Sequence, residues 1–449
     1  MTNDHNKTKT RTLGSYYTPE LTVKYMVEKT LPYITTKSKI LDPACGDGVF
    51  LKEYLKHGIS PDQLYGYDVN PDILNLVPSD IKNIYIRDSL QDLEGEYDII
   101  IANPPYSSNE CDYIKKYREL LRKKYYPIPP SNLYSLFLLN GIRHLKKGGV
   151  LCFLVLDSFI SNVYYKPLRQ EILKYCKIKE ITLAPRTLFH QVNADVRTCI
   201  VILEKCDDEK GKKNNIMCLH DRIEDEQEYW VSKNKQYVKQ SEFHKLPNYT
   251  FFINIPKNII KIIINPNKRL GDVLSGGTGI STGNDKEFLR PVDKVKNDGR
   301  WVGYFKNGLK QPYYYEPTMC IEKDYKSNMK RSKNYMIRNE RFFFREGITC
   351  SSVGVNFSAS YMPKGNLFGV NANLFCENTT ELLYCLGLLN SKIARYIMKA
   401  ILNRTNNISS MYVKSLPYTT PPQDKKTHSK NCKITHSRKK ERSELRHIG

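Results

Sequence analysis

Short apolar runs recur along the first 205 residues, and each is bounded by polar or turn-forming residues. Uninterrupted runs of this kind are typical of strands buried on both faces of a parallel sheet, and they occur at 40–41, 64–67, 84–86, 99–102, 150–156, 178–183 and 198–203. Helical segments are expected between them, from 19, from 48, at 111–124 and at 132–145. The pattern predicts an α/β domain in which 178–183 and 198–203 form a hairpin.

Polar and glycine-rich stretches predict where these elements stop. The segment 146–149, Lys-Lys-Gly-Gly, is expected to close the helix at 132–145 with a C-cap glycine. The charged stretch 206–248 is expected to be an irregular connection that leads out of the sheet domain.

A polar side chain follows each of the first four predicted strands: Asp42, Asp68, Asp88 and Asn103. Open α/β sheets bind ligands at the carboxyl ends of their strands. Asp42 can accept from a cationic amino-acid group, Asp68 stands where such folds place a carboxylate on ribose hydroxyls, and Asp88 can accept from an adenine amino group. Each acid alone is equally typical of a turn or a helix cap, but three acids and an asparagine at successive strand ends together favour a binding site.

Two further segments belong to this predicted edge. The turn Pro43-Ala44-Cys45-Gly46 is built of small residues, which let a ligand approach the backbone, and it is not the GxGxxG dinucleotide motif. Tyr17-Thr18-Pro19 precedes the first helix; Thr18 either caps that helix or belongs to a loop that folds over a cofactor.

The fourth strand runs into Asn103-Pro104-Pro105-Tyr106, where the prolines stop it at once. The Asn103 side chain and the Pro104 carbonyl offer two acceptors, which suit an exocyclic amino group. A nucleobase amine is a poor nucleophile, and two acceptors on its hydrogens would localise its lone pair. Tyr106 offers a flat surface on which an extruded base can stack. An ordinary Pro-Pro turn is the alternative.

Charge indicates the partner. Lysine and arginine number 70 against 47 acidic residues, a net charge of +23, which favours a polyanion such as nucleic acid. The 12 cysteines show no metal-ligand spacing, so we predict no metal site and a reducing, cytoplasmic environment. The polar first 13 residues lack a signal core, and no apolar run is long enough to span a bilayer.

The sequence changes character after about 250. A glycine-rich stretch, 274–284, lacks the P-loop lysine, and 326–345 mixes cations with aromatic residues in a way that suits phosphate contact. An amphipathic helix is predicted at 382–402, before a polar segment whose side chains are typical of both base readers and loops. The candidate DNA-binding residues are Lys330, Arg331, Lys333, Asn403 and Arg404.

These motifs together resemble the gamma-class amino-methyltransferases of restriction–modification systems, which methylate N6 of adenine in DNA. The segment 42–46 is similar to their cofactor motif, 103–106 to their catalytic motif, and 17–19 to the motif that precedes the cofactor turn. The order of cofactor motif, catalytic motif and recognition domain distinguishes the gamma class. The resemblance covers about 13–418, with similar stretches at 279–284 and 389–392, and it is most specific over the first 205 residues.

The resemblance implies a Rossmann-like, S-adenosylmethionine-binding catalytic domain at 1–250. It implies a mixed α+β target-recognition domain at 251–420, and we expect a disordered basic tail at 421–449. Asn103 and Pro104 would orient the target amine, and Tyr106 and Phe189 would sandwich the base. The implied cofactor-binding residues are Tyr17, Thr18, Pro19, Asp42, Pro43, Ala44, Gly46, Asp68, Asp88 and Asn103.

We expect duplex DNA as the substrate and a monomeric protein. Any restriction endonuclease is expected on a separate chain. Protein-glutamine and RNA-base methyltransferases with the same turn remain alternatives, as does a DNA-binding subunit with an inactive site. Cytosine N4 is also open on chemical grounds. The long basic C-terminal region and the 17–19 motif argue against a protein substrate.

Overall fold

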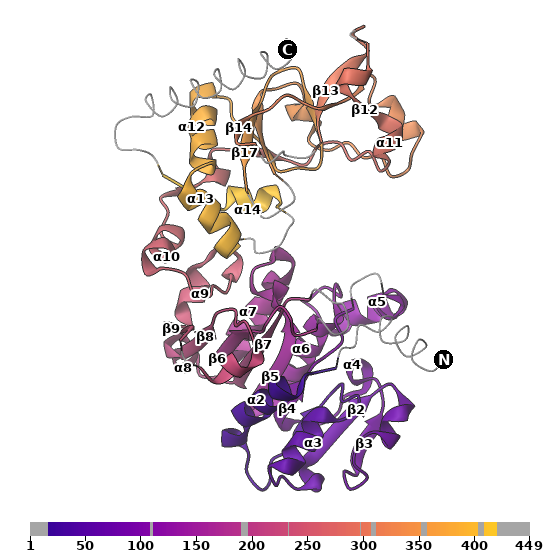
Figure 1. Cartoon of the computed structure of the whole chain (residues 1–449), viewed down its shortest axis with the longest axis vertical. Helices are drawn as coiled ribbons and strands as arrows, with labels where there is room; N and C mark the ends of the chain where they lie inside the picture. The colour runs from indigo at the N-terminus through magenta and orange to yellow at the C-terminus, as the bar shows by residue number, and fades with distance from the viewer. Residues whose placement is uncertain are drawn as a thin grey trace. The chain divides into compact units, whose positions relative to one another are not determined.

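The computed structural model describes residues 17–107, 111–189, 196–231, 233–296, 298–306, 311–351, 357–402 and 408–419. Contacts divide the chain into two compact units, Met1–Asn254 and Ile255–Gly449 (Figure 1). The first unit contains all of the strands that the apolar runs predict. The predicted tail, 421–449, lies outside the described residues.

The first unit is built on one sheet, whose described residues form nine strands in the order β3-β2-β1-β4-β5-β7-β6-β8-β9. The first five strands in this order, β3-β2-β1-β4-β5, are all parallel to their neighbours. β7 runs antiparallel to both β5 and β6. The α/β fold and the hairpin predicted from the apolar runs are confirmed. The strands are β1 Ile40–Asp42, β2 Leu64–Asp68, β3 Asn83–Ile86, β4 Tyr97–Ala102, β5 Leu145–Leu156, β6 Cys176–Leu183, β7 Thr198–Lys205, β8 Ile216–His220 and β9 Lys235–Lys239.

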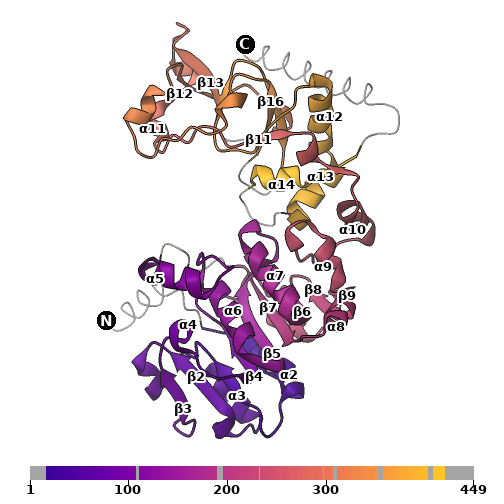
Figure 2. The ribbon, with the colours of Figure 1, turned by 180° about the vertical axis from the view of Figure 1, so that it is seen from behind.

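Helices cover both faces of this sheet (Figure 2). α2 packs on α3, while α6 packs on α4 and α7. The strand order reverses between β1 and β4, so right-handed crossovers place α3 and α6 on opposite faces. The helices are α2 Glu20–Thr30, α3 Val49–Lys56, α4 Ser89–Asp92, α5 Asp112–Lys124, α6 Leu133–His144, α7 Lys166–Tyr175, α8 Glu209–Asn214 and α9 Ser241–Lys245.

The predicted C-cap at 146–149 is wrong. α6 ends at His144, and the chain enters β5 directly at Leu145. Gly148 lies inside that strand with φ +78°, next to a register shift between β4 and β5. A Cβ on Gly149 would lie 2.9 Å from the carbonyl oxygen of Asp98. The two glycines therefore serve a bulge in which two backbones come close, rather than a helix end.

The prediction for 206–248 is also wrong. This stretch adds β8 and β9 to the same sheet, with β8 parallel to β6 and β9 antiparallel to β8. Three of the five β8 residues are buried, no β9 residue is buried, and Ile216 and Tyr237 are exposed. β9 forms the edge of the sheet, and the charged residues that flank both short strands conceal them in the sequence.

The second unit is mixed α+β, as predicted. Its described strands form a five-stranded sheet β11-β19-β16-β17-β14, a four-stranded sheet β12-β15-β13-β18 and the pair β10-β20. An aromatic core, which includes Tyr304, Phe342, Phe343, Phe368 and Phe375, fills it. The strands are β10 Lys268–Arg269, β11 Ser275–Gly277, β12 Leu289–Pro291, β13 Trp301–Phe305, β14 Tyr313–Tyr314, β15 Met319–Glu322, β16 Gly347–Cys350, β17 Ala359–Met362, β18 Leu367–Phe368, β19 Asn373–Phe375 and β20 Pro417–Tyr418.

The single helix predicted at 382–402 is broken. α12 ends at Leu389, the side chain of Asn390 bonds the backbone of Ala359 at 2.8 Å, and Ser391 caps the next helix through the N–H of Ala394 at 3.1 Å. The last turns form a π-helix, Ile397–Leu402. The helices of this unit are α10 Lys257–Ile264, α11 Asp285–Phe288, α12 Thr379–Leu389, α13 Lys392–Tyr396 and α14 Ser410–Lys414.

The glycine-rich stretch 274–284 begins as β11, which pairs antiparallel with β19. A Cβ on Gly279 would lie 2.1 Å from the carbonyl oxygen of Phe368, so this glycine serves close backbone packing. Among the described residues, no helix is long and apolar enough to cross a bilayer.

Candidate active site

The Asn103 side chain occupies the carboxyl end of β4, between two hydroxyl groups. β4 is buried throughout Ile99–Ala102, which fixes the point where the chain emerges from the sheet. The Asn103 amide donates from Nδ2 to Thr18 Oγ1 at 3.0 Å, and the Tyr106 hydroxyl donates to Asn103 Oδ1 at 2.5 Å. These two bonds hold the plane of the amide.

Tyr106 is itself held on several sides. Its hydroxyl also lies 3.1 Å from the carbonyl oxygen of Leu154 in β5, and its own carbonyl accepts from Asn132 Nδ2 at 3.2 Å. Asn132 is the N-cap of α6. The 103–106 corner is therefore tied to the neighbouring strand and to the following helix, which makes it a rigid support.

The rings predicted to sandwich a base contact each other edge to face. The ring centroids of Tyr106 and Phe189 are 6.4 Å apart with an interplanar angle of 67°, and the two residues are 9% and 3% exposed. A base placed between them would have to part the two rings. The rest of the predicted loop, 190–195, lies outside the described residues.

Thr18 does not cap α2. The N-cap residue of α2 is Pro19, whose side chain makes no hydrogen bond to the first turn. Instead the Thr18 hydroxyl meets Asn103, and Tyr17 is exposed. Of the two alternatives for this segment, the structure rules out capping and joins Thr18 to the 103–106 corner.

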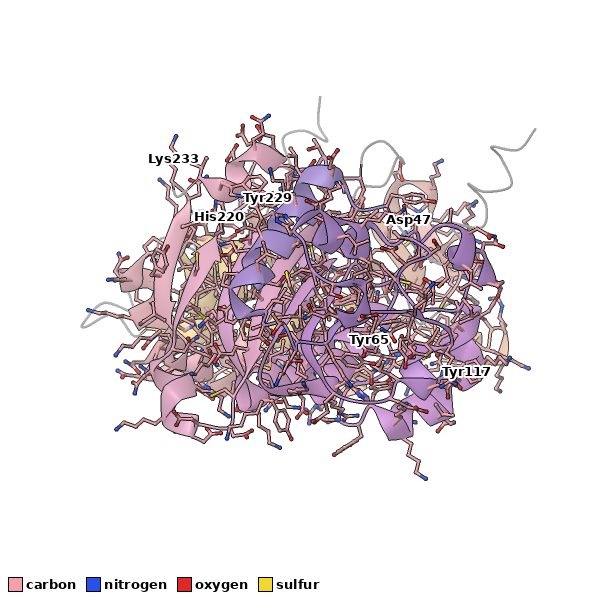
Figure 3. All side chains as sticks on the ribbon, turned by 90° about the horizontal axis from the view of Figure 1, so that it is seen from below. Asp47, Tyr65, Tyr117, His220, Tyr229 and Lys233 are labelled. Carbon is pink, nitrogen blue, oxygen red and sulfur yellow. The ribbon has the colours of Figure 1, made fainter. Side chains whose placement is uncertain are left out.

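A remote segment supplies the missing cap of α2. Glu226 Oε1 accepts from the backbone N–H of Thr22 at 3.0 Å and from its hydroxyl at 2.5 Å. Glu226 opens the 3₁₀ helix Glu226–Trp230, whose Tyr229 stacks on Tyr25 of α2 at 4.7 Å (Tyr229 is labelled in Figure 3). This part of the predicted irregular connection thus holds α2 and, through it, Thr18.

A partly buried ion pair fixes the same helix to the sheet. Lys29 Nζ of α2 lies 2.8 Å from Glu180 Oε2 of β6, and the Tyr25 and Thr182 hydroxyls donate to Glu180 Oε1. Burial alone would raise the pKa of Glu180, but Lys29 and these hydroxyls outweigh it and lower the pKa. Glu180 is therefore held as the carboxylate that anchors α2.

Asp42 closes β1 and is 1% exposed. Its Oδ1 accepts the N–H of Ala44 at 3.1 Å. Burial raises the pKa of Asp42 well above its usual value, and the charges of Asp68 and Asp47 add to the rise (Asp47 is labelled in Figure 3). A cationic ligand beside these carboxylates would relieve both the desolvation and the repulsion.

Asp68 ends β2 and shapes the 42–46 turn. It accepts the backbone N–H groups of Gly46 and Asn70, each at 2.9 Å. Gly46 has φ +52°, which favours glycine, and a Cβ there would meet nothing within 4 Å. Pro43 adds a backbone contact, since its carbonyl accepts from the Ser89 hydroxyl at 2.7 Å. The turn therefore leaves open space beside a fixed carboxylate.

Asp88 is already engaged as the cap of α4. Its Oδ1 accepts the N–H of Leu90 at 2.9 Å, and its Oδ2 accepts from Gln91 Nε2 at 2.7 Å and from the Tyr113 hydroxyl at 2.6 Å. Burial and the bond to Asp88 raise the pKa of Tyr113, so the hydroxyl stays a donor. An adenine amine at Asp88 would have to share a carboxylate that three groups hold.

Arg222 closes the neck of the loop that carries Phe189. Its Nη1 donates to the carbonyl oxygens of Ala184 at 2.5 Å and Thr198 at 3.2 Å, where the loop leaves β6 and enters β7. Its Nη2 pairs with Asp157, the residue after β5. No sequence pattern indicates this arginine, because its partners, two carbonyl groups and the Asp157 carboxylate, are distant in the chain.

The predicted DNA-binding residues of the second unit lie on its surface. Lys330, Arg331 and Lys333 are exposed. Arg331 pairs with Glu287 at 3.2 Å and lies over the Phe288 ring at 5.2 Å, so part of its function is structural. Asn403 and Arg404 lie outside the described residues.

The cysteines and acids do not form a metal site in the described ranges: no group of three or more His, Cys, Asp or Glu is arranged to hold an ion. Cys45, Cys152 and Cys199 are buried. Burial raises the pKa of Cys45 and Cys152, which keeps them as thiols.

Comparison with known proteins finds relatives of this chain. The chain is 26% identical over 373 residues to the adenine-specific methyltransferase PglX of Lacticaseibacillus casei (strain Zhang), covering 72% of this chain and 30% of that protein. It is 26% identical over 296 residues to the type II methyltransferase M.VspI of Vibrio sp. (strain 343), covering 62% and 67%. The chain thus spans less than a third of the length of the first relative.

A solved structure shares the fold over most of the chain. It is a nuclease-deletion mutant of the Type ISP restriction-modification enzyme LlaGI in complex with a DNA substrate mimic, with TM-score 0.62, 15% identity and coverage of 94% of this chain and 54% of that one. Residues 1–254, more than half of the chain, match the N-6 DNA Methylase family. The chain therefore belongs to the N-6 DNA Methylase family, whose members are related to the methyltransferases of restriction–modification systems.

Proposed function

We propose that this protein is a gamma-class, sequence-specific DNA methyltransferase of a restriction–modification system, and that it methylates N6 of an adenine flipped out of duplex DNA. The observation that supports this most is the Asn103 amide at the carboxyl end of β4, held between Thr18 and Tyr106. It lies on the same sheet edge as the carboxylates that close β1 and β2. The site thus combines amine acceptors with a candidate cofactor turn.

The chain's own residues fit S-adenosylmethionine. Buried Asp42, beside Asp68 and Asp47, suits a cationic methionine end, Asp68 suits the ribose, and the open space at Gly46 admits a ligand against the backbone. Tyr17, Thr18, Pro19, Pro43, Ala44 and Asp88 complete the proposed set. When bound, this cofactor supplies an electrophilic methyl group on a sulfonium sulfur.

The proposed work of the 103–106 corner is to make the adenine amine nucleophilic. Asn103 Oδ1 and the Pro104 carbonyl would accept its two hydrogens, so that its lone pair is no longer delocalised into the ring. The Tyr106 hydroxyl fixes the direction of Asn103 Oδ1 before the base arrives. Transfer is direct, with no covalent enzyme intermediate, and positioning and electrostatics supply most of the rate.

Base flipping is part of the proposal, because a base inside a duplex cannot reach the corner. Tyr106 and Phe189 would then accept the base between them, and their edge-to-face contact would be exchanged for two stacking contacts. The cations of the second unit, including Lys330 and Lys333, would hold the phosphate backbone.

Transfer of tritium from labelled S-adenosylmethionine tests the substrate class. Duplex DNA, RNA of the same sequence and a glutamine-bearing release-factor-like protein are compared as acceptors. We expect label in duplex DNA, a loss of about 100-fold or more for Asn103→Ala, and nearly unchanged cofactor binding. Asn75→Ala, which removes an exposed asparagine of the same unit, is the control. Label in RNA or protein alone, or comparable turnover by Asn103→Ala, would refute the proposal.

A further inference from the structure

Three consecutive phenylalanines in the second unit have different environments. Phe342 stacks on Phe375 at 4.7 Å, and Phe343 packs edge to face on Phe368 at 5.0 Å; both are 6% exposed. Phe344 is 41% exposed. Its described ring contact is with Tyr325, at 6.4 Å between centroids. The core of this unit therefore uses the first two rings and leaves the third at the surface.

The backbone of Phe344 adopts a conformation that phenylalanine disfavours. Its φ is +64°, in the left-handed region where glycine is favoured. Two hydrogen bonds of 3.0 Å maintain it, from Phe344 N–H to the Asn366 carbonyl and from Gly365 N–H to the Phe344 carbonyl. A glycine would make the same bonds without strain. Strained residues that the surrounding structure maintains cluster at functional sites.

Two arginines in the same segment lie over the neighbouring Phe342 ring. The guanidinium groups of Arg341 and Arg345 lie 4.8 and 5.8 Å from the ring centroid of Phe342, the residue at the base of the turn. The segment 323–345 contains eight lysines and arginines and two acids. One of these acids, Glu340, forms an ion pair with Lys326 and accepts a hydrogen bond from the Tyr325 hydroxyl at 3.0 Å. The segment that carries Phe344 thus has a net positive charge, with Glu346 following it.

We propose that Phe344 is a wedge that inserts at a base step of duplex DNA, with Arg341 and Arg345 on the flanking phosphates. An apolar ring among cations matches DNA, since proteins unstack base steps with Phe, Leu, Ile or Met while basic groups contact the backbone. This inference rests on the proposed function, because it takes duplex DNA as the partner. It assigns Phe344 a binding role that is separate from the 103–106 corner.

Phe344→Gly tests the wedge, because it removes the ring and relieves the left-handed backbone in one change. Binding of the full chain to duplex DNA that contains its methylation site is measured by fluorescence anisotropy at several salt concentrations. We expect thermal stability equal to or above wild type, and affinity lower by about 5- to 150-fold, as loss of one base–aromatic contact implies. The slope of log K against log salt should stay unchanged.

Two variants serve as references. Arg341→Gln should weaken binding and reduce that slope by about one, as loss of a phosphate contact does. Tyr237→Ala, which removes an exposed aromatic ring from the first unit, should bind DNA like wild type.

Wild-type affinity in the stably folded Phe344→Gly variant would overturn the wedge. So would reduced methylation with unchanged DNA affinity, which would place the ring against another part of the protein. Failure of the wild-type chain to methylate any DNA would instead refute the proposed function, so the two failures are distinguishable.

Discussion

Replacing Thr18 by valine tests whether the 103–106 corner is held ready for chemistry from outside β4. Valine keeps the branched shape of Thr18 but removes Oγ1, the acceptor 3.0 Å from Asn103 Nδ2. Thr18→Ser keeps the hydroxyl and is the matched control. The reasoning is that an amide without the Thr18 contact presents Oδ1 in a less fixed direction, even with the Tyr106 hydroxyl still donating to Oδ1.

The magnitude follows from the lost hydrogen bond. Leaving a half-buried amide N–H without its acceptor costs about 1–3 kcal/mol. If that cost falls on the oriented state, the rate drops about 5- to 150-fold at about 1.4 kcal/mol per factor of ten. The assay is the single-turnover rate of methyl transfer at saturating cofactor, with cofactor Kd measured separately by calorimetry. An unchanged single-turnover rate together with a raised Kd would refute this reasoning and leave Thr18 as a cofactor contact alone.

Other predictions concern the supports of the site. Arg222→Met removes the ion pair to Asp157 and two carbonyl contacts at the neck of the Phe189 loop. We expect the free energy of unfolding to fall by about 2–4 kcal/mol and the 2-aminopurine fluorescence on DNA binding to be weaker. The surface control Arg87→Met should show neither effect. Asp42→Asn keeps the oxygen that accepts from Ala44 but removes a buried charge. Because burial raises the pKa of Asp42, wild type loses stability as pH rises through that pKa; the variant should be the more stable protein in melts at neutral pH, yet fail to bind cofactor. The pKa of Glu180 is lowered in the folded protein, so the contribution of Glu180 to folding stability is present above the usual carboxyl pKa range. That contribution is lost as pH falls through the pKa of the folded state. Lys29→Met should remove this pH dependence from urea unfolding curves at pH 3–6.

The sequence predicts the strands of the sheet well where a run of residues is buried on both faces. Buried apolar runs such as 99–101 form central strands, and a polar residue at the end of each run lies at the carboxyl edge of the sheet. This is why Asp42, Asp68 and Asn103 could be named in advance. The same logic fails toward the edge of the sheet, where β8 and β9 are short, partly exposed and flanked by charged residues.

Long-range support was beyond sequence reasoning for a different reason. Glu226 reaches Thr22 across 204 positions, and nothing in a charged stretch shows which acid will cap a distant helix. Continuous apolar residues at 382–402 likewise concealed the break at Asn390 and Ser391, because the break comes from side-chain bonds to other elements. Three identical aromatic residues at 342–344 gave no sign of which one would be exposed.

The central claim is that the Asn103 corner makes an adenine amine attack a methyl donor. Modification-sensitive sequencing of DNA from cells that express the wild-type chain or Asn103→Ala tests it most directly. We predict N6-methyladenine at one recurring sequence motif with the wild-type chain, and none at that motif with Asn103→Ala. Absence of N6-methyladenine, methylation of cytosine N4 in its place, or persistence of the mark in Asn103→Ala would contradict the claim.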